Sequence, residues 1–133
     1  MSITQDMIDT YPGNLAPSPL GLYVSCIDAC LACDQACTAC ADACLAEEEL
    51  ERLTRCIRLD LDCADICGAT ARVLSRHTDT DPRVTLAQLR ACAAACEVCA
   101  IECESHRHSH CQACGAACRR CQKACEDLIA ALA

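Results

Sequence analysis

Cysteine, rather than leucine or an aromatic residue, occupies most of the positions that the pattern of this chain predicts to be buried. Within each of four segments the cysteines recur at steps of three, four or seven residues, with alanine and charged residues between them. That spacing places each set on one face of an α-helix, where leucine and isoleucine usually lie in a helical bundle. The pattern predicts four helices, over about residues 18–45, 49–76, 82–105 and 108–131.

Local signals mark some of the helix ends. At Ser18–Pro19 and again at Asp81–Pro82, a predicted N-cap residue precedes a proline at the first helical position. The other two breaks, near residues 46–49 and 105–107, contain neither Gly nor Pro. Because short connections make neighbouring helices antiparallel, we expect an all-α fold, an up-down-up-down four-helix bundle over residues 18–133.

Residues 1–17 are expected to form a separate N-terminal segment, a short helix followed by a Pro-rich linker. Its apolar side chains have helical spacing, which predicts an amphipathic turn that packs on the bundle. These side chains belong to Ile3, Met7, Ile8 and Tyr11.

The composition narrows the function classes. Cysteine occupies 18 of 133 positions, Phe and Trp are absent, and the formal net charge is −8 with a pI near 4.8. An acidic chain argues against nucleic acid as a partner, because that binding depends on basic patches. No run of about 18 apolar residues is present, so no membrane span is predicted. The first residues have neither a basic start nor an apolar stretch, so we expect no export signal and a location in the reducing cytoplasm.

Two structural explanations compete with metal binding for the cysteines. Disulfide-rich small proteins have Gly- and Pro-rich loops, whereas this chain has four Gly and four Pro, and disulfides are rare in reducing compartments. Free cysteine also behaves as a small hydrophobe, but alanine would fill a narrow core without the risk of oxidation. Neither explanation accounts for rows of thiols in register, so we expect four such rows to converge on the bundle axis as metal ligands.

All eighteen cysteines are therefore predicted metal ligands. In chain order, helix by helix, they are Cys26, Cys30, Cys33, Cys37, Cys40 and Cys44; Cys56, Cys63 and Cys67; Cys92, Cys96, Cys99 and Cys103; and Cys111, Cys114, Cys118, Cys121 and Cys125.

The arrangement of the thiols favours one metal. Soft thiolates select Cu(I), Zn(II) or iron–sulfur clusters. Ferredoxin-type runs are absent from the sequence, and discrete tetrahedral zinc sites do not need CxxC and CxxxC pairs that overlap in one ladder. Cu(I) accepts two thiolates and lets each sulfur bridge two ions, and one Cu⁺ per thiolate leaves the buried core neutral. The predicted content is on the order of 18 Cu(I) ions per chain.

Three segments carry a resemblance to a known family. They are the ladder CxxxCxxCxxxCxxCxxxC at 26–44, RCIRLDLDCADIC at 55–67, and CAAACEVCAIECESHRHSHCQACGAACRRCQKAC at 92–125. Over roughly residues 20–128 the chain resembles the four-helix-bundle copper storage proteins, and in particular their cytosolic branch. The resemblance implies tight storage of many Cu(I) ions in a preformed bundle, and a homotetramer.

The antiparallel order predicts two unlike bundle ends. At one end, named the plug, the rows continue with apolar or small residues: Leu22, Tyr23, Thr70, Leu74, Leu86, Leu89, Leu128 and Leu132. The opposite end, named the mouth, collects three of the four histidines and the outermost cysteines of the rows: Cys44, Cys56, Cys103 and Cys111.

The histidines at the mouth are candidate ligands. His106 and His110 continue the rows beside terminal cysteines and match the family pattern, so we expect them to bind copper first and pass it to the thiols. His108 is nearer a turn and is expected to be solvated. His77, in the loop at the plug, is expected to be structural or exposed.

Asp60 fills the gap in its row between Cys56 and Cys63. Its carboxylate is predicted to be a weak oxygen ligand or an acceptor that orients ligands near the mouth; the alternative is a partly solvated carboxylate. The charges at residues 47–51 and at Arg119–Arg120 are expected to form solvated or interhelical faces.

The leading functional hypothesis is a cytosolic copper store and detoxification protein rather than an enzyme. Its expected partners are copper ions, a cytosolic copper chaperone and further copies of the chain. A zinc or mixed-metal buffer resembling metallothioneins stays as an alternative, which would saturate near one ion per four thiols. A thiol redox protein is a third hypothesis, but it needs one accessible, activated thiolate, whereas these thiols face inward.

Overall fold

The structure, a computed structural model, describes residues 2–133. Over these residues the chain forms α-helices and one short 3₁₀ helix, with no strand, and the all-α prediction is confirmed. In chain order the elements are α1 (Ile3–Asp9), α2 (Leu20–Leu45), η1 (Leu50–Arg52), α3 (Thr54–Leu74), α4 (Pro82–Glu104) and α5 (Ser109–Leu132).

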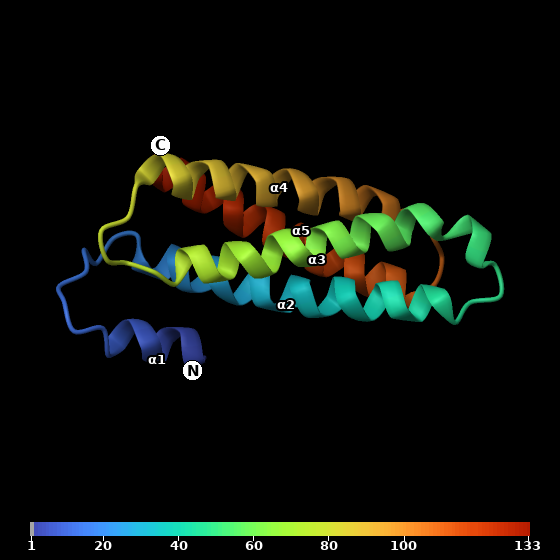
Figure 1. Ribbon diagram of the computed structural model, residues 1–133, viewed down its shortest axis with the longest axis horizontal. Coiled ribbons are helices and arrows are strands. Elements are labelled where there is room, and N and C mark those ends of the chain that lie inside the picture. The colour runs from blue at the N-terminus through green and yellow to red at the C-terminus, as the bar shows by residue number, and fades with distance from the viewer. Residues whose placement is uncertain (1) are drawn as a thin grey trace.

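Helices α2 to α5 form the predicted up-down-up-down bundle, and α1 lies along its side (Figure 1). Both α2 and α4 pack against α3 and α5, so α2 and α4 occupy opposite corners of the bundle. The connection from α3 to α4 lies at the plug, whereas those from α2 to α3 and from α4 to α5 lie at the mouth (Figure 1). Each bundle end is therefore built from segments far apart in sequence.

The ends of the bundle helices follow the sequence signals only in part. The Asp81 carboxylate accepts a hydrogen bond from the Arg83 backbone N–H at 2.9 Å, and Pro82 is the first residue of α4, as predicted. The prediction that Ser18 caps the first bundle helix is wrong. Pro19 has a non-helical backbone (φ −107°, ψ 47°) and takes the cap position, so α2 begins at Leu20 without a side-chain cap.

The start of the second bundle helix also differs from the prediction. Residues 49–53 form η1 and a turn, and α3 begins at Thr54 rather than near 49. Glu49 already departs from helical geometry (φ −94°, ψ 43°). This irregular stretch turns the Leu53 side chain into the core at the mouth, where it is completely buried.

Helix α1 is confirmed, but its apolar side chains do not all pack on the bundle. Ile3 and Met7 are 68% and 64% exposed. The buried residue is Thr4, whose hydroxyl donates a 2.7 Å hydrogen bond to the Asp28 carboxylate on α2. A polar contact therefore attaches α1, and Ile3 and Met7 line an open groove above α2 and α3.

The predicted plug is confirmed as the apolar end of the core. Leu74, Leu89 and Leu128 are at most 1% exposed and close the bundle axis. Thr70 is also buried there, and its hydroxyl donates to the Ile66 carbonyl and accepts from the Gln88 amide. Full burial of large leucines stabilises this end without using a thiol.

Two helices reach the hydropathy of membrane-spanning segments. By length and composition alone, α2 and α4 could cross a membrane, with mean hydropathies of 1.2 and 1.5 over their most apolar windows. Cysteine and alanine raise these values, and the cysteines of both helices lie inside the bundle. A helix that lines a protein core passes the same test.

Candidate metal centre

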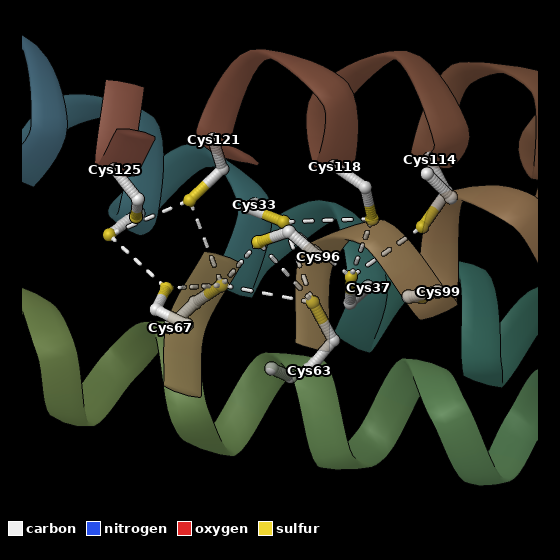
Figure 2. Close-up of a cluster of buried hydrophobic side chains, with 14 of the residues drawn as sticks. Cys33, Cys37, Cys63, Cys67, Cys96, Cys99, Cys114, Cys118, Cys121 and Cys125 are labelled. Carbon is white, nitrogen blue, oxygen red and sulfur yellow. Dashed lines mark hydrogen bonds between the residues drawn. The ribbon is translucent and has the colours of Figure 1, made fainter. Parts of the chain in front are cut away.

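The eighteen thiols form one column of sulfur along the bundle axis, and Figure 2 shows a part of it. Every cysteine is a free thiol, and none is more than 1% exposed. Sulfurs on different helices approach closely along the whole axis. The Sγ–Sγ distance is 3.7 Å for Cys26 and Cys125 near the plug, and 3.8 Å for Cys56 and Cys103 near the mouth. The prediction that four rows converge on one axis is confirmed.

Groups of four ligand atoms overlap along this column. In each group all ligand atoms lie within 4.8 Å of one another. Five such groups are Cys30, Cys92, Cys121 and Cys125; Cys33, Cys67, Cys96 and Cys121; Cys33, Cys37, Cys63 and Cys118; Cys37, Cys99, Cys114 and Cys118; and Cys40, Cys44, His110 and Cys111. Because the first four of these groups are linked through Cys33, Cys37, Cys118 or Cys121, this part of the column is not divided into separate tetrahedral sites.

The close packing of the thiols changes their acidity. The hydrogen bond between Cys26 and Cys125 lowers the pKa of Cys26 to about 5, because a neighbouring S–H stabilises the thiolate. At the mouth, burial and then the charge of Cys56 raise the pKa of Cys44 to about 11. Hydrogen bonds between the thiols therefore shift their pKa values in both directions: the one with Cys125 lowers the pKa of Cys26, whereas the one with Cys121 raises the pKa of Cys30.

Asp60 lies inside the column and is completely buried. Its Oδ1 accepts from the thiols of Cys99, Cys103 and Cys114 at 3.2, 3.4 and 3.4 Å, and its Oδ2 faces the Cys56 thiol at 3.8 Å. Burial, followed by the charge of Cys114, raises the pKa of Asp60 to about 8. The alternative of a partly solvated carboxylate is therefore wrong, because four thiols on three helices surround this side chain.

His110 is the histidine that the fold brings into contact with the thiols. Its Nδ1 lies 3.4 Å from Cys40 Sγ and 3.6 Å from Cys111 Sγ. His106 lies at the same bundle end, but its close polar contact is with a carboxylate: its Nε2 is 2.7 Å from Glu102 Oε2. The two histidines that the sequence grouped together thus have different neighbours.

His108 is only partly solvated, so the expectation for it is met in part. Its ring stacks on the His110 ring, with centroids 5.5 Å apart and planes 24° from parallel. Its side chain is 30% exposed, and its Nδ1 is buried without a hydrogen-bond partner among the described residues. His108 is therefore part of the histidine cluster at the mouth.

Sequence reasoning missed the role of the glutamates at the mouth. Glu47 was expected to lie on a solvated or interhelical face, and its Oε2 is in fact 2.7 Å from His110 Nε2 at the start of α5, a contact that was not predicted. A signal was present, since Glu47 follows Cys44 by three residues and so continues the row of α2 by one step. Glu102 likewise precedes His106 by four residues, which is a contact spacing on a helix.

Other predicted side chains have structural surroundings. His77 lies between the rings of Tyr11 and Tyr23, with centroids 5.9 and 5.5 Å away, and burial lowers the pKa of its imidazole. The Arg119 guanidinium pairs with the Glu104 carboxylate through two nitrogens, each 2.9 Å from an oxygen, and so links α5 to α4. His77 thus has the expected structural role, and Arg119 lies on an interhelical face, as expected.

A buried column of free thiols inside a four-helix bundle, with histidines at one end, defines a protein that binds many soft metal ions. The family model described as copper storage protein matches residues 22–130. The chain belongs to this family.

Solved structures and one curated relative agree with this assignment. The copper storage protein Ccsp of Streptomyces lividans, loaded with 10 copper equivalents, is 52% identical with a TM-score of 0.94, covering 96% of this chain and 98% of that one. A second structure, of a cytosolic copper storage protein from Streptomyces lividans with five coppers, is 55% identical with a TM-score of 0.82, covering 83% of this chain and 93% of that one. Cu(I)-bound BsCsp3, from Bacillus subtilis, is 40% identical with a TM-score of 0.73, covering 80% of this chain and 96% of that one.

The curated relative is the uncharacterized cysteine-rich protein YhjQ of Bacillus subtilis. It is 42% identical over 88 residues, which make up 66% of this chain and 78% of the relative. The family assignment that the sequence motifs suggested is confirmed.

Proposed function

We propose that this protein stores Cu(I) in the thiol column and so keeps excess copper from reacting in the cytoplasm. The observation that carries the proposal is the overlap of neighbouring four-ligand groups through shared sulfurs. A shared sulfur bridges two ions, and bridging thiolates are a form of coordination that Cu(I) accepts. Membership of the copper storage family and its copper-loaded members support the same conclusion.

The sulfur spacing suits ions held by two or three thiolates. With a metal–thiolate bond of about 2.3 Å, three sulfurs around one ion lie about 4.0 Å apart, and two on opposite sides lie about 4.6 Å apart. The closest sulfur pairs lie 3.6 Å apart, as for Cys37 and Cys118, to 3.9 Å apart, as for Cys33 and Cys63, and all ligand atoms of one group lie within 4.8 Å of one another. Three-coordinate ions therefore fit between the closest sulfurs with small movements, and two-coordinate ions need sulfurs that lie farther apart.

The proposed ligands are the eighteen cysteines, with His106 and His110 receiving copper at the mouth. Asp60 serves chiefly as an acceptor that orients the thiols around it. The protein binds rather than catalyses, because each thiol is at most 1% exposed and is poorly placed to attack an external substrate. The proposed location is the cytosol, and the proposed assembly is a homotetramer. Copper is proposed to be delivered by a cytosolic chaperone.

The decisive experiment is a Cu(I) titration of the reduced, metal-free protein without oxygen, against a chromophoric chelator. We expect saturation near one Cu(I) per cysteine, about 18 ions. Circular dichroism should show the same helix content before and after loading, because buried leucines and cysteines stabilise the bundle without metal. Saturation near one ion per four thiols would instead indicate a zinc buffer, and a parallel Zn(II) titration provides the comparison.

A further inference from the structure

The mouth contains a carboxylate that faces two histidine rings at once. Glu47 lies just after α2, on the connection to η1, and its Oε2 is 2.7 Å from His110 Nε2 and 3.6 Å from His108 Nε2. Its side chain is 30% exposed. Both rings thus present the same nitrogen to one carboxylate.

This contact decides which ring nitrogen of His110 carries the proton. A carboxylate oxygen accepts hydrogen bonds, so the Nε2 that lies 2.7 Å from it must donate. In a neutral imidazole the other nitrogen, Nδ1, then has a free lone pair. That nitrogen is the one at 3.4 Å from Cys40 Sγ and 3.6 Å from Cys111 Sγ.

The neighbouring ring agrees with this arrangement. His108 stacks on His110, also turns Nε2 toward Glu47, and leaves its own Nδ1 buried without a hydrogen-bond partner among residues 2–133. A buried ring nitrogen without a partner is uncommon and marks a group available to a ligand. At His106 the same pattern occurs with Glu102, 2.7 Å from Nε2.

We infer that Glu47 is a positioning residue: it holds His110 in the Nε2-protonated form, with Nδ1 directed at the outermost thiols, so that Nδ1 joins Cys40, Cys44 and Cys111 as a ligand for the first Cu(I) ion. The inference rests on the proposed copper storage function and extends it to a residue outside the ligand set. A carboxylate that fixes a metal-binding histidine in this way raises the basicity of the ligand nitrogen and removes the freedom of the ring to flip.

The first test requires no copper. Nitrogen-15 NMR of the histidine side chains in the reduced metal-free protein identifies the protonated ring nitrogen of His110. We expect protonation at Nε2 in the wild type. In Glu47→Gln the amide can either accept from Nε2 or donate to it, so we expect a mixture of the two forms.

The matched control is Glu48→Gln, which removes the same charge one residue away. Glu48 is exposed and makes no polar contact within the described part of the chain. The control should leave the form of His110 unchanged. If Glu47→Gln also leaves it unchanged, the inference is overturned, whatever the protein does with copper.

The second test measures the affinity of the first Cu(I) ion against a competing chelator. Loss of an outer partner of a metal-bound histidine weakens binding by about 10-fold to 100-fold. We expect such a loss in Glu47→Gln, with total capacity unchanged, and no loss in Glu48→Gln.

The His110→Ala background separates a positioning role from a general effect of charge. There Glu47→Gln should cause no further loss, because the ring through which it acts is absent. A loss of the same size in both backgrounds would overturn the inference. Failure of the wild-type protein to bind Cu(I) would refute the proposed storage function, while the NMR result would still decide whether Glu47 sets the form of His110.

Discussion

Replacing Leu128 by alanine tests whether the plug holds the bundle together without taking part in copper traffic. Leu128 is completely buried on α5, and it closes the axis with Leu74 and Leu89. Leu→Ala substitutions at fully buried sites cost about 2–5 kcal/mol, the sum of lost transfer free energy and the cavity left behind. For a site this enclosed we expect the free energy of unfolding of the metal-free protein to fall by about 3 kcal/mol.

That loss converts into a melting temperature. An unfolding entropy of about 2.1 cal/mol/K per residue gives about 0.28 kcal/mol/K for this chain. The Tm of the reduced, metal-free protein should therefore fall by about 10 °C, measured by circular dichroism. The control Leu61→Ala, at a side chain that is 45% exposed on α3, should lower Tm much less.

The same variant reports on the route of copper. Leu128 is remote from the histidines of the mouth, so the rate of Cu(I) loading in stopped-flow measurements and the total capacity should equal those of the wild type. If loading accelerates several-fold in Leu128→Ala, copper passes through the plug and the assignment of the mouth is wrong. An unchanged Tm would refute the reasoning about packing.

Four further substitutions separate ligand, scaffold and attachment roles. Asp60→Asn should leave Cu(I) capacity within about one ion of the wild type, because thiolates are the preferred ligands; a loss of several ions in the chelator titration would make Asp60 a ligand of a cluster. Gly21→Ala should raise the free energy of unfolding by about 0.5–1 kcal/mol in denaturant titrations, since an added Cβ on this exposed helical residue meets no atom within 4 Å. Gly68→Ala should gain less, because its Cβ would lie 2.9 Å from the Asp34 carboxylate. Thr4→Val removes the hydrogen bond to Asp28. Amide hydrogen exchange in α1 should become about tenfold faster, while the copper capacity stays the same. Unchanged exchange would mean that apolar contacts attach the helix.

The column of thiols could be predicted because its cause is local. A step of three or four residues fixes one face of a helix, so the spacing from Cys26 to Cys44 alone shows which side of α2 is buried. Asp81 and Pro82 mark the start of α4 in the same local way, through a side-chain acceptor and a fixed φ. The apolar residues of the plug follow from continuing the rows past the last cysteine.

The details of the mouth could not be predicted in this way, because they depend on contacts between distant segments. Glu47 and His110 are 63 residues apart, and they meet only after the connections from α2 to α3 and from α4 to α5 have come together. Similarly, no residue near Glu49 in the sequence predicts the turn that moves the start of α3 to Thr54. That turn accompanies the burial of Leu53 in the core, which depends on the other helices. Position within a row showed that Asp60 faces inward but could not show which thiols would donate to it.

The complete burial of the thiols has a consequence for how a filled molecule can be distinguished from an empty one. Each Cu⁺ that replaces a thiol proton leaves the total charge unchanged, so filling the protonated thiols keeps a chain with 19 acidic and 11 basic residues near its formal charge of −8. Cysteine contributes almost nothing to the outer surface. Solubility, electrophoretic mobility and long-range attraction to other proteins therefore change little with the copper content. A partner that discriminates between a filled and an empty molecule therefore has to contact the histidine rings of the mouth.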